Sequence, residues 1–290
     1  MKNCNINNNT AGANAGGVQW NGANGKLIGC TFINNSAPNG LGGAVSWGGA
    51  NANITNSTFK GNTAKNVAGF YYGSVNGTFT GCIFIDNNAN SNMGALQVIG
   101  NNCNLIDSNF INNTATGHTG GVYWNGANGI VANCNFIGNT AKTINGGAIL
   151  WMGANGSLTD STFINNSAPN SVGGAISWGG TSAIIKGSIF INNTSRAVAG
   201  AIYFASTGSI SNCTFNSEWI KSNGIQAMND LNINGGKGIV DIWINGTLSG
   251  ISIVVLNNET YYYPPNTNIN LIYLQNHEHE TAKDNLQNNQ

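Results

Sequence analysis

The chain carries very little charge. Only 7% of its 290 residues are charged, the formal net charge is zero, and lysine and arginine form no run. Nucleic acids and anionic membranes are bound through clustered basic residues, so the sequence has no electrostatic footprint for either partner. It also lacks an apolar run of about 20 residues, the length that a membrane-spanning helix requires. We expect neither nucleic-acid binding nor membrane insertion by this segment.

Residues that bind metals are few and scattered. The six cysteines and three histidines show none of the spacings typical of zinc sites, and the carboxylates are not clustered as a calcium site requires. His118 is isolated, and His277 and His279 lie in a polar tail where we expect them to be solvated. The sequence therefore predicts no metal and no other cofactor.

Asparagine and glycine are abundant instead. Asparagine makes up roughly a fifth of the chain, and the 41 glycines are about twice the average share. A polar composition can indicate disorder, but disordered chains usually have high net charge and few aromatic or β-branched residues. Here aromatic and β-branched residues are plentiful and periodic, so we expect a folded protein.

A repeat of about 26 residues runs from residue 4 to about residue 218. Each copy has a glycine, which in five of the eight copies belongs to a Gly-Gly pair, then an aromatic or apolar residue shortly after it, and a phenylalanine about a dozen residues later. Apolar positions alternate with glycine, asparagine and threonine over two to four residues, which indicates strands and turns and gives no helical period. The phenylalanines keep register: Phe32, Phe59, Phe84, Phe110, Phe136, Phe163, Phe190 and Phe215.

Three short strands in each repeat predict an all-β fold, a parallel β-solenoid in which each coil bonds to the next about 4.8 Å away. About eight to nine coils would form a rod on the order of 40 Å long. A single coil cannot bury its own apolar face, so we expect stability to come from stacking identical side chains between coils.

An asparagine follows each phenylalanine by three positions. In stacked coils these residues share a column, where identical amides hydrogen-bond along the stack. Glu218 occupies the next position of the column, and the repeat ends there. The sequence therefore predicts a structural amide ladder, which consists of Asn35, Asn62, Asn87, Asn113, Asn139, Asn166 and Asn193.

These motifs carry a resemblance to known repeats. Gly-Gly-Ala-Ile at residues 146–149 and 173–176, together with Phe-x-x-Asn in each coil, resembles the repeat of the chlamydial polymorphic outer membrane proteins. With its high asparagine content, the chain resembles more closely the adhesin-like surface proteins of methanogenic archaea. The resemblance covers about three quarters of the chain. It implies a right-handed parallel β-helix and a role in surface display and attachment, and it supplies no catalytic residue.

We divide the chain into three parts. Residues 1–218 form the parallel β-helix. Residues 219–274 form a β-rich segment with Asn-Gly and Asn-Asn turns that favour antiparallel pairing, either as a terminal coil and cap of the solenoid or as the first strands of an incomplete immunoglobulin-like module. Residues 275–290 are polar and aperiodic, so we expect a disordered tail. Because the chain opens inside a coil and has no export signal or anchor, we expect it to be part of a longer protein.

The tryptophan column has two interpretations. Rings such as Trp47 and Trp124, about 4.8 Å apart in successive coils, would form a row that stacks on a glycan. Each ring also follows an apolar residue by two positions, and alternation along a strand then points both inward to the core. The residues between them would face outward and are the candidate binding residues: Gln19, Tyr71, Gln97, Tyr123 and Tyr203.

Five cysteines occupy one inward column that other coils fill with serine. A disulfide requires Cα atoms about 4.4 to 6.8 Å apart, which only adjacent coils provide. Cys4 and Cys30 meet this condition. We otherwise expect buried free thiols at Cys82, Cys134 and Cys213, and Cys103 lies alone in a turn column.

One pair of acidic residues raises the question of catalysis. Asp107 and Asp160 fall in one column two coils apart, near 10 Å, roughly the separation of the carboxylates in an inverting glycosidase. Asn133 lies between them, and glycine or asparagine fills the position in other coils, as is typical of a bend. We predict a bend for this column.

Two functions are compatible with these observations, and a third, ice binding, is disfavoured by them. We expect a non-catalytic, adhesin-like rod at the cell surface that attaches to glycans or surface proteins of a host or neighbouring cell. The alternative is a polysaccharide-active enzyme of the lyase or glycosidase type. Ice binding requires a regular threonine row, and the row with Thr31, Ile83 and Asn109 is irregular. An extracellular location rests on the resemblance, and glycosylation sequons such as Asn53 and Asn155 are compatible with it.

Overall fold

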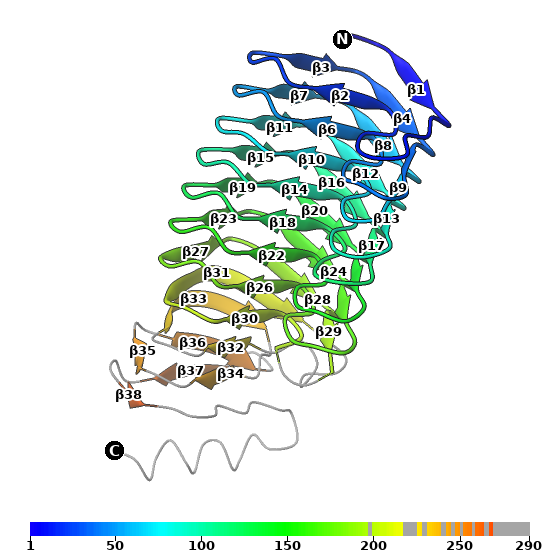
Figure 1. Cartoon of the computed structure of the whole chain (residues 1–290). Coiled ribbons are helices and arrows are strands. Elements are labelled where there is room, and N and C mark those ends of the chain that lie inside the picture. The colour runs from blue at the N-terminus through cyan, green and yellow to red at the C-terminus, as the bar shows by residue number, and fades with distance from the viewer. Residues whose placement is uncertain are drawn as a thin grey trace.

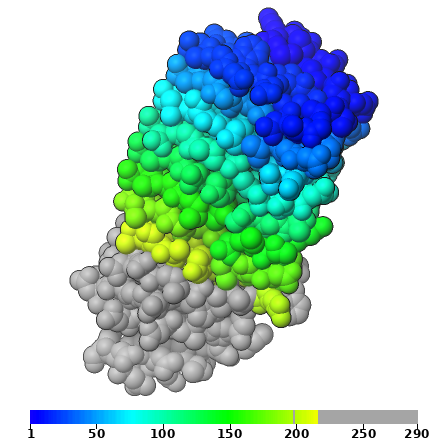
Figure 2. Space-filling model, in the orientation of Figure 1, coloured from blue at the N-terminus to red at the C-terminus, as the bar shows by residue number. Residues whose placement is uncertain are grey.

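The chain folds as a stack of β-strand coils. The computed structural model describes residues 1–196 and 199–216 in full, and the backbone of seven further strands between residues 225 and 268. The described chain contains strands and turns, and its coils stack along one axis as a parallel β-solenoid of about eight coils (Figure 1). The colour of the described residues changes from blue to yellow along this axis, because each coil follows the one before it in the sequence (Figure 2). Both the all-β class and the solenoid are therefore confirmed. Nowhere in the described part does a helix long and apolar enough to span a membrane occur.

One wall of the solenoid is a ten-stranded parallel sheet, here called the Trp sheet. Its first eight strands each begin one or two residues after a glycine of the repeat, and in Figure 1 the ten strands run down the middle of the stack. The strands are β2 (Val18–Trp20), β6 (Val45–Trp47), β10 (Phe70–Tyr72), β14 (Leu96–Val98), β18 (Val122–Trp124), β22 (Ile149–Trp151), β26 (Ile176–Trp178), β30 (Ile202–Phe204), β32 (Ile225–Ala227) and β34 (Ile242–Ile244).

A larger sheet contains two strands from each coil, here called the Leu strand and the Phe strand. The Leu strands are β3 (Lys26–Ile28), β7 (Asn53–Thr55), β11 (Thr78–Thr80), β15 (Asn104–Ile106), β19 (Ile130–Ala132), β23 (Ser157–Thr159) and β27 (Ala183–Lys186). The Phe strands are β1 (Asn5–Asn7), β4 (Thr31–Ile33), β8 (Thr58–Lys60), β12 (Ile83–Ile85), β16 (Asn109–Ile111), β20 (Asn135–Ile137), β24 (Thr162–Ile164) and β28 (Ile189–Ile191). In the last coil described in full, β31 (Gly208–Asn216) covers both.

A seven-stranded sheet of two-residue strands, here called the Ser/Thr sheet, follows the Phe strands. Its first residue faces outward, and its second residue, alanine in six of the seven strands, is buried there. The strands are β5 (Ser36–Ala37), β9 (Thr63–Ala64), β13 (Asn88–Ala89), β17 (Thr114–Ala115), β21 (Thr140–Ala141), β25 (Ser167–Ala168) and β29 (Thr194–Ser195).

Corners between strands are formed by single residues with positive φ. Between Leu and Phe strands this residue is, for example, Asn56 (φ 47°), Asp107 (φ 52°) or Asp160 (φ 48°). Asparagine, aspartate and glycine tolerate the left-handed conformation best, because a short polar side chain bonds locally and glycine has no Cβ. The bend predicted for the Asp107 and Asp160 column is confirmed, and the corners account for much of the asparagine content.

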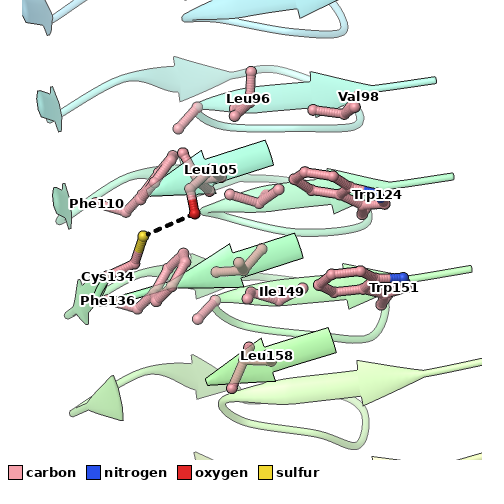
Figure 3. Close-up of a cluster of buried hydrophobic side chains, with 14 of the residues drawn as sticks. Leu96, Val98, Leu105, Phe110, Trp124, Cys134, Phe136, Ile149, Trp151 and Leu158 are labelled. Carbon is pink, nitrogen blue, oxygen red and sulfur yellow. Dashed lines mark hydrogen bonds between the residues drawn. The ribbon is translucent and has the colours of Figure 1, made fainter. Parts of the chain in front are cut away.

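The core consists of aromatic columns that run along the axis. Successive phenylalanines from Phe32 to Phe215 stack with ring centroids 4.6–5.1 Å apart and planes within 4–13°. Trp124 and Trp151 stack at 5.0 Å, one above the other (Figure 3). Burying such a side chain contributes about 1.5–3 kcal/mol, and a stacked aromatic neighbour adds about 0.5–1.5 kcal/mol.

The tryptophan column belongs to this core. Trp47, Trp124, Trp151 and Trp178 have 0% exposed surface, so the interpretation as core is confirmed. The alternative, a row of tryptophans that stacks on a glycan, is wrong for these four residues because no ligand reaches their faces. Trp20, in the first coil, is half-buried and stacks on Trp47 at 4.8 Å.

The predicted amide ladder is present in all seven coils. The Asn113 Nδ2 donates to the Asn139 Oδ1 (3.0 Å) and to the Phe84 carbonyl oxygen (2.9 Å). The Asn113 Oδ1 accepts from the Asn87 backbone N–H (3.0 Å) and the Asn87 Nδ2 (2.9 Å). The amide-to-amide bonds link Asn35 through to Asn193. One further residue, Asn9, extends the ladder: its Nδ2 donates to the Asn35 Oδ1 at 2.9 Å. The Phe-x-x-Asn motif does not include Asn9, because Ile6 takes the phenylalanine position in its coil.

The cysteines are free thiols, including Cys4 and Cys30. All except Cys4 are buried. In Figure 3 the Cys134 thiol points to the Leu105 carbonyl oxygen, 3.6 Å away. Burial raises the pKa of Cys134 to about 12 and that of Cys82 to about 11, so these thiols stay protonated near neutral pH. The expectation of buried thiols is confirmed for the inward column beyond Cys4.

Parallel stacking continues beyond residue 218. The strands β32 and β34 extend the Trp sheet, and β33 (Leu231–Gly238) and β35 (Thr247–Ser249) extend the larger sheet, all in parallel. The prediction of antiparallel pairing is wrong for these strands. Ile202 pairs with Ile225 and Ile225 with Ile242, so the coils shorten and the period disappears while the stacking persists.

Antiparallel pairing occurs in two places in the same segment. The strands β36 (Ser252–Leu256) and β37 (Glu259–Tyr263) pair in this way, as the Asn-Asn turn between them predicts. The short strand β38 (Thr267–Asn268) pairs antiparallel with β35. The proposed tail at residues 275–290, with His277 and His279, lies outside the described residues, and the domain boundaries stay predictions.

Candidate functional site

The outward row of the Trp sheet is the candidate binding surface. Each member is the middle residue of a three-residue strand, between two inward side chains. Strand pairing places the members in register along the axis, one in each coil: Gln19, Ser46, Tyr71, Gln97, Tyr123, Leu150, Ser177 and Tyr203.

Exposure divides this row into two kinds of residue. Tyr71, Tyr123 and Tyr203 are half-buried, and Gln19 is exposed. Gln97 retains only 8% exposure, which makes it the one predicted binding residue that is not accessible.

The buried members of the row owe their burial to their neighbours. Gln97 pairs with Tyr71 on one side and Tyr123 on the other, and Ser46, Leu150 and Ser177 each have a tyrosine in an adjacent strand. A large ring covers a smaller side chain in the next strand, about 4.8 Å away, and so removes it from solvent. The surface therefore consists of tyrosine rings separated by recessed positions.

The tyrosines have a fixed spacing. Tyr71 and Tyr123 are two coils apart, or about 10 Å, and Tyr203 lies three coils beyond Tyr123, or about 14 Å. A tyrosine offers an apolar face and a hydroxyl that donates and accepts, which suits a partner that is apolar on one side and polar at its edge. This arrangement supports binding.

A histidine that seemed isolated in the sequence lies beside this row. The His118 ring centroid is 6.3 Å from that of Tyr123, with the planes tilted by 55°. His118 is half-buried, and burial lowers its pKa below the ordinary value of 6.5. Its neutral imidazole is therefore favoured at physiological pH and extends the surface beside Tyr123, in the middle of the row.

The acidic pair is separate from this surface. Asp107 and Asp160 are exposed corner residues between Leu and Phe strands, and the tyrosines stand on the Trp sheet. Within residues 1–196 and 199–216, no three histidine, cysteine or acidic side chains come together as a metal site requires.

Two outward columns were missed by the sequence reasoning. One is the first residue of each Ser/Thr strand, which follows the ladder asparagine directly and is serine or threonine in every strand except β13, where it is Asn88. The other is a second amide ladder of exposed asparagines with positive φ, at the turns between the Trp sheet and the Leu strands. Its members bond at 2.9–3.5 Å from Nδ2 to Oδ1: Asn24, Asn51, Asn76, Asn102, Asn128 and Asn155.

The second ladder involves two of the glycosylation sequons. The Asn76 Nδ2 donates to Asn51 at 3.0 Å, and the Asn155 Nδ2 donates to Asn128 at 3.2 Å. A glycan at either residue would be attached at a nitrogen that bonds to the coil before it.

Comparison with protein-family models, with curated proteins and with solved structures finds no match.

Proposed function

We propose that this chain is a non-catalytic, adhesin-like rod displayed outside the cell, which attaches to glycans or surface proteins of a host or neighbouring cell through its tyrosine row. The observation that carries the proposal is the division of the aromatic residues. Four tryptophans and the phenylalanine column fill the core, whereas Tyr71, Tyr123 and Tyr203 stand half-buried on one outer face.

The distribution of the rings favours attachment. Several rings on one rigid face give a partner several weak contacts at fixed distances, and linked contacts bind more strongly together than each does alone. Tyrosine also loses little conformational entropy on binding, because it has few rotatable bonds. The resemblance of the Gly-Gly-Ala-Ile and Phe-x-x-Asn motifs to surface-protein repeats supports the same role and the extracellular location.

The test is retention of the folded chain on a glycan and whole-cell array. A variant with Tyr71→Ala, Tyr123→Ala and Tyr203→Ala is compared with the parent chain. The matched control carries Asn53→Ala, Asn104→Ala and Ser157→Ala, three outward positions on Leu strands of the opposite sheet. We expect retention by the parent and the control and its loss in the tyrosine variant.

Other outcomes contradict parts of the proposal. Equal retention of the tyrosine variant would move attachment to another face, and no retention of the parent on any surface would refute attachment. Release of shortened glycans by the parent, abolished by Asp107→Asn, would show that the chain is an enzyme.

A further inference from the structure

An open surface depression of about 420 Å³ lies at the corner where the Phe strands β12, β16 and β20 meet the Ser/Thr sheet. We call it the corner groove. It spans three successive coils on a face of the solenoid other than the tyrosine row. Its lining is polar and comprises Asp86, Asn88, Asn112, Thr114, Thr140 and Lys142.

Hydrogen-bonding groups in the corner groove have no partner within the described part of the chain. Elsewhere in the Ser/Thr row the hydroxyls bond to one another, as Thr63 does to Ser36 and Thr194 to Ser167, both at 3.0 Å. In the groove, the side chains of Asn88, Thr114 and Thr140 make no such bond to any described residue. Three neighbouring coils therefore present free donors and acceptors about 4.8 Å apart.

Opposite charges mark the two ends of the groove. Asp86 belongs to the first of the three coils and Lys142 to the third, about 10 Å further along the axis. Among the described residues neither side chain forms an ion pair, and both are exposed. In a chain with 7% charged residues, two unpaired opposite charges at the ends of one polar groove favour a ligand that carries both signs.

We propose that the corner groove binds a short zwitterionic glycan that lies along the rod axis. An amino sugar would place its ammonium group near Asp86, and an acidic sugar would place its carboxylate near Lys142. The hydroxyls between them would bond to Thr114, Thr140 and the amides. Since it concerns another face and other residues, this site does not depend on the tyrosine row.

The experiment is an NMR titration of the full chain with a disaccharide of glucuronic acid and glucosamine. Three forms are compared: the free amine, the N-acetylated form and the form whose carboxyl is reduced. Exposed ion pairs are weak, so we expect the free amine form to bind about 1.5- to 5-fold better than either other form at low salt, and this preference to shrink as salt is added.

Variants assign this selectivity to the groove. Asp86→Asn, which keeps a residue that tolerates positive φ, removes the preference for the amine, and Lys142→Gln removes the preference for the carboxylate. Thr114→Val combined with Thr140→Val removes two hydroxyls from the lining and weakens the binding of all three forms. Asp160→Asn and Lys186→Gln alter exposed charges elsewhere and serve as controls with unchanged binding.

The result that overturns the proposal is binding with equal affinity for all three forms, or no binding of any. Binding that is unchanged by Thr114→Val with Thr140→Val but is lost in the tyrosine variant would place the glycan on the Trp sheet. The corner groove would then be refuted, while the proposed function would stand.

Discussion

The amide ladder should dominate the stability of individual coils, and Asn113→Ala tests this. Asn113 lies at the middle of the ladder with 0% exposure, and its side chain makes four hydrogen bonds. Alanine removes all four and keeps the backbone unchanged.

The expected cost follows from the groups that are left behind. The Asn87 backbone N–H and one hydrogen of the Asn87 Nδ2 lose their acceptor in a buried site. A buried donor without a partner costs about 1–3 kcal/mol, so two such donors cost about 2–6 kcal/mol. This is a large fraction of the total stability of about 5–15 kcal/mol that is usual for a folded domain.

The assay is equilibrium urea unfolding followed by circular dichroism at pH 7. The matched control is Asn135→Ala, which changes the same residue type in an exposed strand position whose side chain makes a single exposed bond, 2.9 Å long, to Asn109. We expect the control to cost less than about 1 kcal/mol. If Asn113→Ala costs no more than the control, the ladder does not stabilise the solenoid and the reasoning is refuted.

Three other predictions concern packing and pH. Gly156→Ala would place a Cβ 2.5 Å from the Trp151 ring and should lower stability by about 1–3 kcal/mol in thermal melts, whereas Gly12→Ala, with nothing within 4 Å, should change it by less than about 0.5 kcal/mol. Burial raises the Cys134 pKa from 9.0 to about 12, so iodoacetamide at pH 8 should label this thiol only after unfolding. The free energy of unfolding that the protonated thiol contributes should be complete below pH 9 and be lost as the pH rises towards 12. The variant Cys134→Ser should reduce that loss. Burial lowers the His118 pKa, so its contribution is present above pH 6.5 and is lost as the pH falls through the folded value; identical acid sensitivity in His118→Gln would contradict this.

Residue columns were predictable because the solenoid converts sequence period into spatial position. Once Phe32 and Phe59 share a phase, they stack, and the same reasoning placed Asn113 in its ladder and Trp124 in the core. Alternation along three-residue strands then separated inward from outward positions. No long-range information beyond the period was needed.

Burial within an outward row was less predictable. The period predicts that Gln97 faces outward, but its exposed fraction depends on the size of the Tyr71 and Tyr123 side chains in the neighbouring strands. The corner groove depends on Asp86 and Lys142, each of which occurs in only one of the three coils that line it. Such features arise from residues that differ between coils. Aligning the repeats for the residues that they share does not detect them.

Beyond the end of the period we predicted a terminal coil or cap, but the shortened coils themselves could not be read from the period. Ile225 and Ile242 continue the Trp sheet although the coils between them have become shorter. A parallel ladder requires only that strands lie next to one another, and the chain between them can vary in length. Periodicity therefore detects coils of equal length and misses shortened ones.

Stacking has a mechanical consequence. Each coil contacts only the coils beside it, so a pulling force along the axis would detach one coil at a time from an end of the stack. Every coil of about 26 residues would release roughly 90 Å of extended chain, against the 4.8 Å that it occupies in the rod. A rod built in this way lengthens in steps under a pulling force and dissipates energy at each step. When the force is removed, the coils stack again as the hydrogen bonds between the ladder amides re-form.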